Sequence, residues 1–311
     1  MHYKIINKDM PQDGSLLRIR GTEPIYLIIN GKREWIKTPE ELRKRGFNFG
    51  QVKEVTEKEM ESIPIKDEIE KKAPIEKPIL EYTKKAITSI KQYTKYPHRI
   101  IVVDNNSSDG SAEYLQSING ITVILNKTNK GYAKALNDGI RISSNKYICC
   151  MNCDIEVIEN WLFVLVDCLE SSKNIGCVGP KQINENGKIS GTAIIGSNND
   201  RRFFGMGADS DDIRYNKKID CISLSGSCFL VKRDVLNKIG LFDENYFLFF
   251  EETDLHFRMR EHGYRVVYCS QSVIYHYFDK APKDDINVKE IFEKSERYFE
   301  KKFKNMLKKE R

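Results

Sequence analysis

The sequence predicts an α/β fold with a mostly parallel sheet, preceded by a small α+β module. Beyond residue 78, short apolar runs that read as strands alternate with segments of helical spacing, which favours parallel strands joined by right-handed crossovers. The run from Tyr147 to Met151 is apolar or aromatic throughout, as in a strand covered on both faces, and it ends abruptly in polar residues. The 311 residues exceed one typical domain, so we expect two unequal domains.

Composition and charge limit the classes of protein that remain. The chain is 40% hydrophobic, which is enough to bury a core. It has no apolar run of the roughly 18 to 20 residues that span a bilayer, and its first residues lack the apolar core of a signal peptide, so we expect a cytoplasmic protein. The net charge of +6 suits anionic ligands or a membrane surface and does not by itself indicate nucleic acid.

The eight cysteines are interpreted as small, reduced residues of the core. Cys150 and Cys153 form a C-x-x-C motif, which leaves a zinc site as the alternative. The sequence has no second pair of cysteines and no nearby pair of histidines to complete a zinc ligand set.

Residues 1–66 are predicted to form the small module. Strands are expected at Leu16 to Ile19 and at Ile25 to Ile29, because both runs are apolar and are bounded by turn residues. Thr38 and Pro39 then open a helix, as a capping residue followed by a proline at the first helical position. The pattern assigns no chemistry to this module.

Residues 67–77 are charged, contain Pro74 and lack apolar periodicity, which indicates a linker. The larger domain is predicted to span residues 78–285. Its first elements, in chain order, are expected to be a helix over 81–94, a strand over 100–103, a helix over 111–117, a strand over 121–125 and a helix over 129–142.

The strand at Tyr147 to Met151 ends in two acids, Asp154 and Glu156, with Asn152 before them. Ligands gather at the carboxyl ends of parallel strands, and hard divalent cations prefer oxygen ligands. The N-x-D-x-E arrangement is therefore suited to holding a divalent cation beside phosphates. A strand followed by an ordinary polar turn is the alternative.

A second acidic cluster follows the aromatic run that ends at Phe250. Glu251, Glu252 and Asp254 stand together there, and the preference of a helix N-terminus for negative charge is the structural alternative to a functional role. Arg258, four residues after Asp254, is expected to hold one of these carboxylates in place.

Four stretches together resemble the family 2 glycosyltransferases, and the rhamnosyltransferase-like branch is the most similar. They occur in the family's order within residues 80–280 and read IIVVDNNSSDGSAEYL, NKTNKGYAKALNDGI, YICCMNCDIEVIENWL and GSCFLVKRDVLNKIGLFDENYFLFFEETDLHFRMREHGYRVVYCSQSVIYH. The resemblance implies a GT-A fold and transfer of a sugar with inversion at its anomeric carbon. It also implies a donor linked to UDP, dTDP or GDP, a glycan or lipid-linked acceptor, and a place in bacterial surface-glycan synthesis.

The resemblance places five residues on the nucleotide side. Asp104 ends a strand where the family's acidic residue meets the base or ribose, and capping of the next helix is the alternative. Asn129, Gly131 and Asn137 match the segment N-x-G-x-x-x-A-x-N, whose glycine lets the backbone lie against the nucleotide, although both asparagines can instead be turn or cap residues. Asn152 stands where the family's D-x-D motif has its first aspartate.

Asp154 matches the second aspartate of that motif, and the resemblance implies that it binds Mn²⁺ or Mg²⁺ on the donor's diphosphate. His276 occupies the place of a family histidine that completes the metal shell, with a purely structural histidine as the alternative. Glu252 matches the general base of the family's E-D-x-D motif, and Asp254 follows in the same motif as the second catalytic candidate. The aromatic residues before them are expected to raise the pKa of the base.

One departure from the family is the opening of the larger domain. The family begins there with a long apolar strand and a loop that forms part of the nucleotide pocket, whereas this chain passes from the linker directly to the helix at Glu81. Either Ile75 to Leu80 supplies a short strand, the N-terminal module lends one, or the protein is a weakened relative that binds a sugar nucleotide without turnover.

The last residues, 286–311, are predicted to form a basic amphipathic helix. Phe292, Phe299 and Phe303 fall on one side of it, with many lysines elsewhere. We expect this helix to pack on its own domain. The alternative is peripheral contact with the inner face of an anionic membrane, where lipid-linked acceptors reside.

Overall fold

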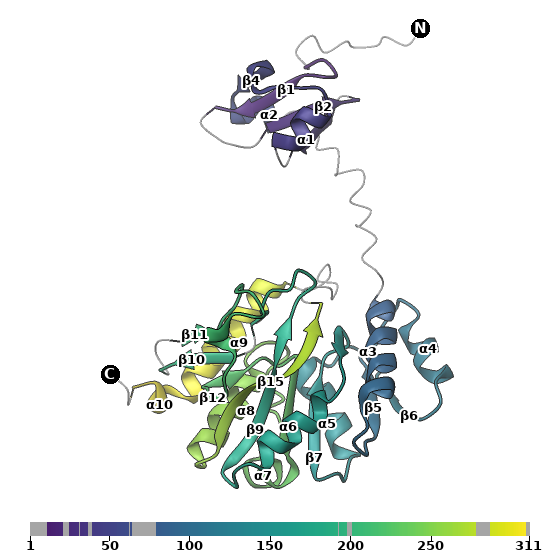
Figure 1. Ribbon diagram of the computed structural model, residues 1–311, viewed down its shortest axis with the longest axis vertical. Helices are drawn as coiled ribbons and strands as arrows, with labels where there is room; N and C mark the ends of the chain where they lie inside the picture. The colour runs from purple at the N-terminus through teal and green to yellow at the C-terminus, as the bar shows by residue number, and fades with distance from the viewer. Residues whose placement is uncertain are drawn as a thin grey trace. The chain divides into compact units, whose positions relative to one another are not determined.

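The computed structural model describes residues 11–20, 25–30, 32–36, 39–61, 63, 79–191, 193–197, 201–277 and 287–308. The chain divides into two compact units, Met1–Glu76 and Lys77–Arg311 (Figure 1). The predicted linker, residues 67–77, lies outside the described residues.

The N-terminal unit is a small α+β module. Its elements are β1 (Leu16–Ile19), β2 (Ile25–Ile29), β3 (Lys32–Ile36), α1 (Pro39–Lys44), η1 (Phe49–Gln51), β4 (Val52–Val55) and α2 (Glu57–Glu61). The strands form one sheet in the order β3-β2-β1-β4. The expected β1 and β2 are present within their predicted bounds. The sequence did not indicate β4, which pairs parallel to β1 and contains two exposed charged residues.

The larger unit alternates helices and strands from α3 onward (Figure 1). Its first half contains α3 (Ile79–Tyr93), β5 (Ile100–Asp104), α4 (Ser111–Ser117), β6 (Ile121–Leu125), α5 (Tyr132–Arg141), β7 (Tyr147–Met151), β8 (Ile155–Val157), α6 (Trp161–Glu170) and β9 (Ile175–Ile183). Its second half contains β10 (Ala193–Gly196), β11 (Arg201–Phe203), η3 (Ile213–Tyr215), β12 (Ile219–Asp220), β13 (Ser223–Leu224), β14 (Cys228–Lys232), α7 (Arg233–Ile239), α8 (Glu251–Glu261), β15 (Arg265–His276), α9 (Val288–Lys302) and α10 (Lys304–Lys308). The elements predicted between residues 81 and 151 are all present.

The main sheet has the order β12-β15-β9-β14-β7, with β8 added beside β15. Strand β14 lies between β7 and β9 and is antiparallel to both, whereas β9 and β15 are parallel. The sheet is therefore mixed, and the expectation of mostly parallel strands is corrected in this detail. The reason is that β14 is buried on both faces, and an apolar run of this kind reads the same in either strand direction.

Strands β5 and β6 form a separate, parallel two-stranded sheet. Within the described residues, β5 pairs with no named strand except β6, and β7 pairs with none except β14. The aliphatic residues of β5, Ile100 to Val103, are all only partly buried. Helix α3 begins at Ile79, so Ile79 and Leu80 are helical and do not extend a strand from the linker.

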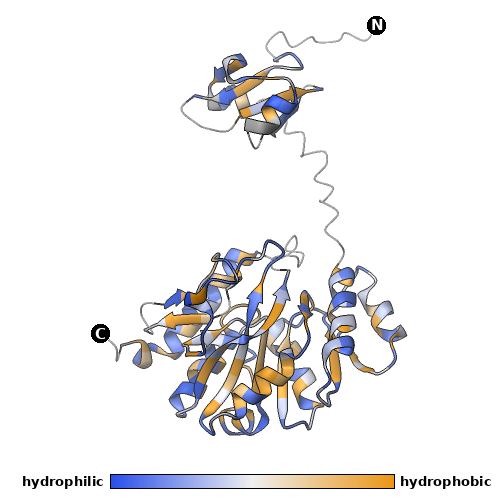
Figure 2. Ribbon diagram, in the orientation of Figure 1, coloured by the Kyte–Doolittle hydropathy of each residue, from blue (hydrophilic) through white to orange (hydrophobic). Residues whose placement is uncertain are grey.

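Helices cover the main sheet on both faces. One core cluster joins β7, β9, β14 and β15 to residues of α5, α7 and α8. A second cluster joins the same sheet to α6, with residues of α3 packed against it. Figure 2 shows apolar residues concentrated along these strands. Six of the eight cysteines are buried, as expected, but Cys153 is exposed in the loop after β7, which corrects its assignment to the core.

The C-terminal helix α9 packs on its own domain, as expected. Phe299 and Phe303 are buried in a cluster with Tyr246 and Phe257. Among the described helices, none combines the length and apolar character needed to cross a bilayer.

Candidate active site

The loop after β7 carries the first group of predicted site residues. Asp154 is 7% exposed, and its Oδ1 atom has no hydrogen-bond partner. The antiparallel pairing of β8 with β15 sets His276 opposite Ile155, so that His276 Nε2 lies 3.5 Å from Asp154 Oδ1. The backbone of Tyr277 donates to the carbonyl oxygen of Asp154 at 3.0 Å, which fixes the loop. The structure thus brings together the two predicted metal ligands.

This pair fits a divalent cation. A buried carboxylate oxygen without a partner is costly, and a cation bound to it would remove that cost. Carboxylate oxygens suit Mn²⁺ and Mg²⁺, and the imidazole nitrogen of histidine is a common ligand of metal ions in proteins. In the part of the chain that the structure describes, no cluster of three or more acidic, histidine or cysteine side chains is suited to a metal. A cation held by this pair would therefore need further ligands.

Glu252 lies in the first turn of α8 and is partly buried. Burial raises its pKa to about 7, against the opposing effect of backbone hydrogen bonds at the helix N-terminus. A general base works best when its pKa is close to the working pH. The neighbouring Glu251 is 3% exposed, and burial, followed by the charge of Glu252, raises its pKa well above the usual range. A pKa of about 7 suits Glu252 to exchange a proton near neutral pH.

Tyr132 connects the loop after β7 to the region of Glu252. Its hydroxyl lies 2.8 Å from Asn152 Oδ1 and 2.8 Å from the carbonyl oxygen of Gly226. The side chain of Glu252 lies against Gly226, where a Cβ atom would come within 3.4 Å of the glutamate Cγ and Cδ. Tyr132 therefore contacts Asn152, two residues before Asp154, and Gly226, against which Glu252 lies. The sequence prediction missed Tyr132, although it directly follows the predicted Gly131.

Asparagine amides organise the loop after β5. Asp104 is 6% exposed, and its carboxylate accepts from the backbone of Ser107 at 3.1 Å within the loop, whereas α4 begins after Gly110 without a side-chain cap. Asn105 donates to Asn129 Oδ1 at 2.8 Å, and the same oxygen accepts from the backbone N–H of Gly131 at 2.9 Å. Asn105 was not predicted, and it links the ends of β5 and β6 to the start of α5.

Gly131 is required by close packing. Its backbone has φ 84° and ψ 168°, a region that essentially only glycine occupies. A Cβ atom at this position would lie 2.6 Å from the carbonyl oxygen of Phe247. The next residue, Tyr132, donates its backbone N–H to the same oxygen at 2.7 Å. The loop before α8 is thereby fixed against the start of α5.

We expect Gly131→Ala to lower the free energy of unfolding by about 3 kcal/mol or more, because it combines a backbone penalty of roughly 1 to 3 kcal/mol with a clash against backbone. Gly120→Ala is the matched control. Gly120 also has a positive φ of 79°, but a Cβ there would meet nothing within 4 Å. Chemical denaturation of both variants measures the difference, and equal losses would show that the contact with Phe247 is unimportant.

Asn137 is 1% exposed and clamps α5 to the loop after α7. Its amide nitrogen donates to the carbonyl oxygen of Phe242 and to Glu244 Oε1, both at 2.9 Å. Its amide oxygen accepts from the backbone N–H of Phe242 at 3.1 Å. The side-chain amide of Asn137 is thus occupied by contacts that join α5 to the loop after α7.

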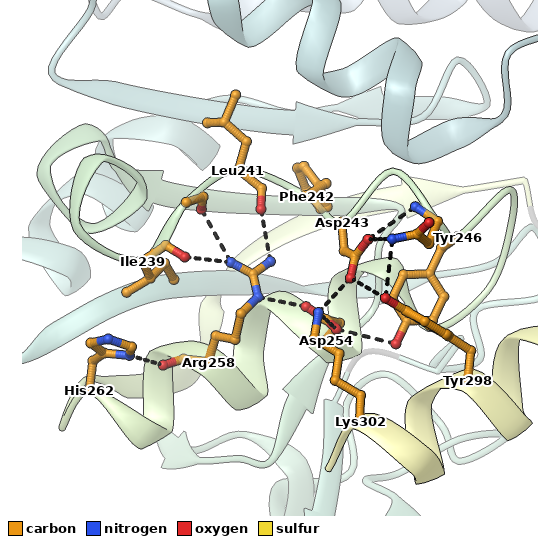
Figure 3. A network of polar contacts seen from close by, with 12 residues as sticks. Ile239, Leu241, Phe242, Asp243, Tyr246, Asp254, Arg258, His262, Tyr298 and Lys302 are labelled. Atoms are coloured by element: carbon orange, nitrogen blue, oxygen red, sulfur yellow. Dashed lines mark hydrogen bonds and ion pairs between the residues drawn. The ribbon is translucent and has the colours of Figure 1, made fainter.

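Asp254 is fully buried within a network of polar contacts (Figure 3). Arg258 Nε lies 2.6 Å from Asp254 Oδ1, and Lys302 Nζ lies 2.6 Å from Asp254 Oδ2. The hydroxyl of Tyr246 donates to Oδ2 at 3.2 Å. The expected pair with Arg258 is present. With its carboxylate occupied in this way, Asp254 is placed to hold α8 in position.

Comparison with known proteins agrees with the sequence motifs. The chain is 22% identical over 216 residues to N-acetylglucosaminyl-diphospho-decaprenol L-rhamnosyltransferase of Mycobacterium tuberculosis, which covers 61% of this chain and 70% of that protein. It is 24% identical over 184 residues to poly-beta-1,6-N-acetyl-D-glucosamine synthase of Staphylococcus aureus, which covers 54% of this chain and 40% of that protein. The chain therefore spans well under half of the synthase.

Solved glycosyltransferase structures show weaker overall likeness. GalNAc-T7 with UDP, GalNAc and Mn²⁺ has a TM-score of 0.49 and 18% identity over 61% of this chain and 40% of that chain. The mannosyltransferase PcManGT from Pyrobaculum calidifontis has a TM-score of 0.45 and 16% identity over 66% of this chain and 55% of that chain.

A match to a family model identifies the family to which the chain belongs. The model described as Glycosyl transferase family 2 matches residues 76–240, which is more than half of the chain. This confirms the family that the sequence motifs indicated, and the α/β architecture agrees with the GT-A fold implied by the resemblance. The chain belongs to glycosyl transferase family 2.

Proposed function

We propose that this protein is an inverting, metal-dependent glycosyltransferase that moves a sugar from a nucleotide-sugar donor to an acceptor hydroxyl. The observation that supports it most is the buried oxygen of Asp154, which has no hydrogen bond and lies 3.5 Å from His276 Nε2. Through Asn152 and Gly226, Tyr132 contacts both this loop and the region of Glu252. One side of this site is suited to a cation on a diphosphate. The other side carries a carboxyl group whose pKa is about 7.

In this proposal Glu252 accepts the proton of the acceptor hydroxyl while the acceptor oxygen bonds to the anomeric carbon. The bond between that carbon and the nearer phosphate oxygen breaks, and the nucleoside diphosphate leaves from the opposite face. One displacement with one base inverts the configuration of the anomeric carbon. A cation held by Asp154 and His276 would neutralise charge on the departing diphosphate.

The nucleotide is proposed to lie on the side of Asp104, Asn129 and Gly131, at the ends of β5 and β6 and the start of α5. The name of the mycobacterial relative specifies a diphospho-decaprenol-linked sugar. That name supports a lipid-linked or glycan acceptor for this protein as well. We therefore place its reaction in bacterial surface-glycan synthesis, on the cytoplasmic side of the membrane.

A panel of UDP-, dTDP- and GDP-linked sugars tests the proposal. The purified protein is expected to release nucleoside diphosphate from one donor in the presence of Mn²⁺ or Mg²⁺, and a chelator is expected to stop the release. Product analysis with the preferred donor then gives the anomeric configuration. Turnover that survives complete removal of metal would contradict the metal dependence, and retention of configuration would contradict a single displacement.

A second candidate is a sugar-nucleotide-binding protein without transfer activity. It is favoured by the separation of β5 and β6 from the main sheet in the described residues, because the family's opening strand contributes to the nucleotide pocket. Calorimetry with UDP, dTDP and GDP in the presence of Mn²⁺ distinguishes the two. Binding without turnover of any donor supports the second candidate, and the absence of any binding contradicts both.

The activity should depend on pH through Glu252. Burial raises the pKa of this carboxyl group to about 7, so it is protonated below that pH and cannot accept a proton. We expect kcat/KM to fall about tenfold per pH unit below this pKa and to level off above it. Initial rates measured across this range at saturating metal check the prediction. A rate that is constant from two pH units below the pKa to one unit above it would contradict the assignment.

A further inference from the structure

The C-terminal helix α9 contacts the segment that precedes Glu252. Ser295 Oγ donates to the carbonyl oxygen of Leu248 at 2.8 Å. The ring of Phe292 packs against Phe249 and Phe250, with centroid separations of 5.5 and 5.3 Å. Helix α9 therefore contacts the residues immediately before α8 through both a hydrogen bond and aromatic packing.

The segment that α9 contacts has a strained backbone. Phe249 and Phe250 are consecutive and have φ of 69° and 68°, in the left-handed region that non-glycine residues rarely adopt. Phe250 is the residue at which α8 starts, two positions before Glu252. Such a conformation persists only when surrounding contacts hold it. The contacts with α9 provide that support. The orientation of the Glu252 side chain at the N-terminus of α8 therefore depends on these contacts.

At the other end of α9, a cluster of charged side chains makes further contacts with α8 and with the segment after α7. Lys302 Nζ lies 2.6 Å from the buried Asp254 and 2.5 Å from Asp243 (Figure 3). Arg258, the other cation on Asp254, also donates to the carbonyl oxygens of Ile239 and Leu241. One carboxylate thus joins α8, α9 and the segment after α7.

We propose that α9 positions the general base, with Lys302 as the positioning residue that couples α9 to the helix of Glu252. This inference rests on the proposed function of Glu252. Lys302 does not belong to the group of Asp154 and His276, so its effect is confined to the proton-transfer side of the site. A loss of positioning should therefore lower kcat while nucleotide binding stays intact. A loss of global stability would instead lower the fraction of active protein without changing the kinetics of the folded molecules.

Lys302→Met keeps the aliphatic part of the side chain and removes the charge. We expect kcat to fall by about 10- to 100-fold, the order of effect produced by small misplacements of a catalytic group, with unchanged donor KM and unchanged nucleotide affinity by calorimetry. Lys302→Arg should restore most of the rate because it keeps the charge. Lys301→Met is the matched control, since Lys301 is exposed on the same turn, and it should behave like wild type.

Phe292→Leu is the second variant, because it removes a ring that is 41% exposed and leaves the charge cluster unchanged. It should also lower kcat at constant donor KM, and it decides the test alone if Lys302→Met does not fold. Folded variants with wild-type kcat would overturn the inference, as would losses that appear equally in KM. Absence of transfer in the wild-type protein would instead contradict the proposed function. Failure of the inference about α9 can therefore be distinguished from failure of the proposed function.

Discussion

Replacement of Glu252 by glutamine is expected to lower kcat by about 10²- to 10⁴-fold, the range that general-base catalysis contributes, and to leave nucleotide affinity unchanged. Glutamine keeps the size of the side chain against Gly226, where the contact distance is 3.4 Å, but it cannot accept a proton. The acceptor hydroxyl then has to attack without a base. Steady-state transfer kinetics together with calorimetry of Mn²⁺ and nucleotide measure the two effects separately.

Glu251→Gln is the matched control for this variant. Glu251 directly precedes Glu252 and is 3% exposed, and burial raises its pKa well above the usual range. The raised pKa favours the neutral form of this carboxyl group, and an amide differs little from a neutral carboxylic acid in size and charge. We expect the control to retain most of its activity. If Glu251→Gln abolished turnover while Glu252→Gln retained it, the base would have to be reassigned to Glu251.

Local pattern was sufficient to predict most elements and the positions of both acidic groups. The run from Tyr147 to Met151 is a strand because it is continuously apolar, and the polar residues after it form the loop that carries Asp154. Pattern did not predict the antiparallel insertion of β14, because burial on both faces contains no information on strand direction. It also missed Tyr132, whose role depends on contacts with Asn152 and Gly226 that are distant in the sequence.

The motif positions were less informative about what each residue does. Asp254 and Asn137 both match family motifs, yet each is buried among partners that come from distant segments. The partners of Asp254 include Lys302 from the C-terminal helix, and those of Asn137 include Glu244. No local rule could identify these contacts, since they depend on how α5, α8 and α9 pack. A motif therefore indicated the region, and tertiary packing determines the contacts that each acid makes.

Replacement of Asp154 by alanine is expected to weaken Mn²⁺-dependent nucleotide binding by at least about 100-fold, because even outer-shell partners of metal ligands contribute 10- to 100-fold. Turnover should fall by about 10³-fold or more, since a cation contributes several kcal/mol to stabilising developing charge. Calorimetry with and without Mn²⁺ gives the binding effect. The metal-independent part of nucleotide binding should be unchanged, because Asp104 and Asn129 lie on other elements.

The stability of the metal-free protein provides a second readout for Asp154. The Oδ1 atom of this residue is buried without a hydrogen bond, and its nearest printed contact is His276 Nε2 at 3.5 Å, so its removal should lower the free energy of unfolding only slightly in the absence of metal. Wild type should gain stability when Mn²⁺ and nucleotide are added, and Asp154→Ala should not. Glu156→Gln is the control, because Glu156 accepts a hydrogen bond from Tyr277 and is not part of the proposed ligand pair. If Asp154→Ala were stabilised by Mn²⁺ and nucleotide as strongly as wild type, the cation would have to bind elsewhere.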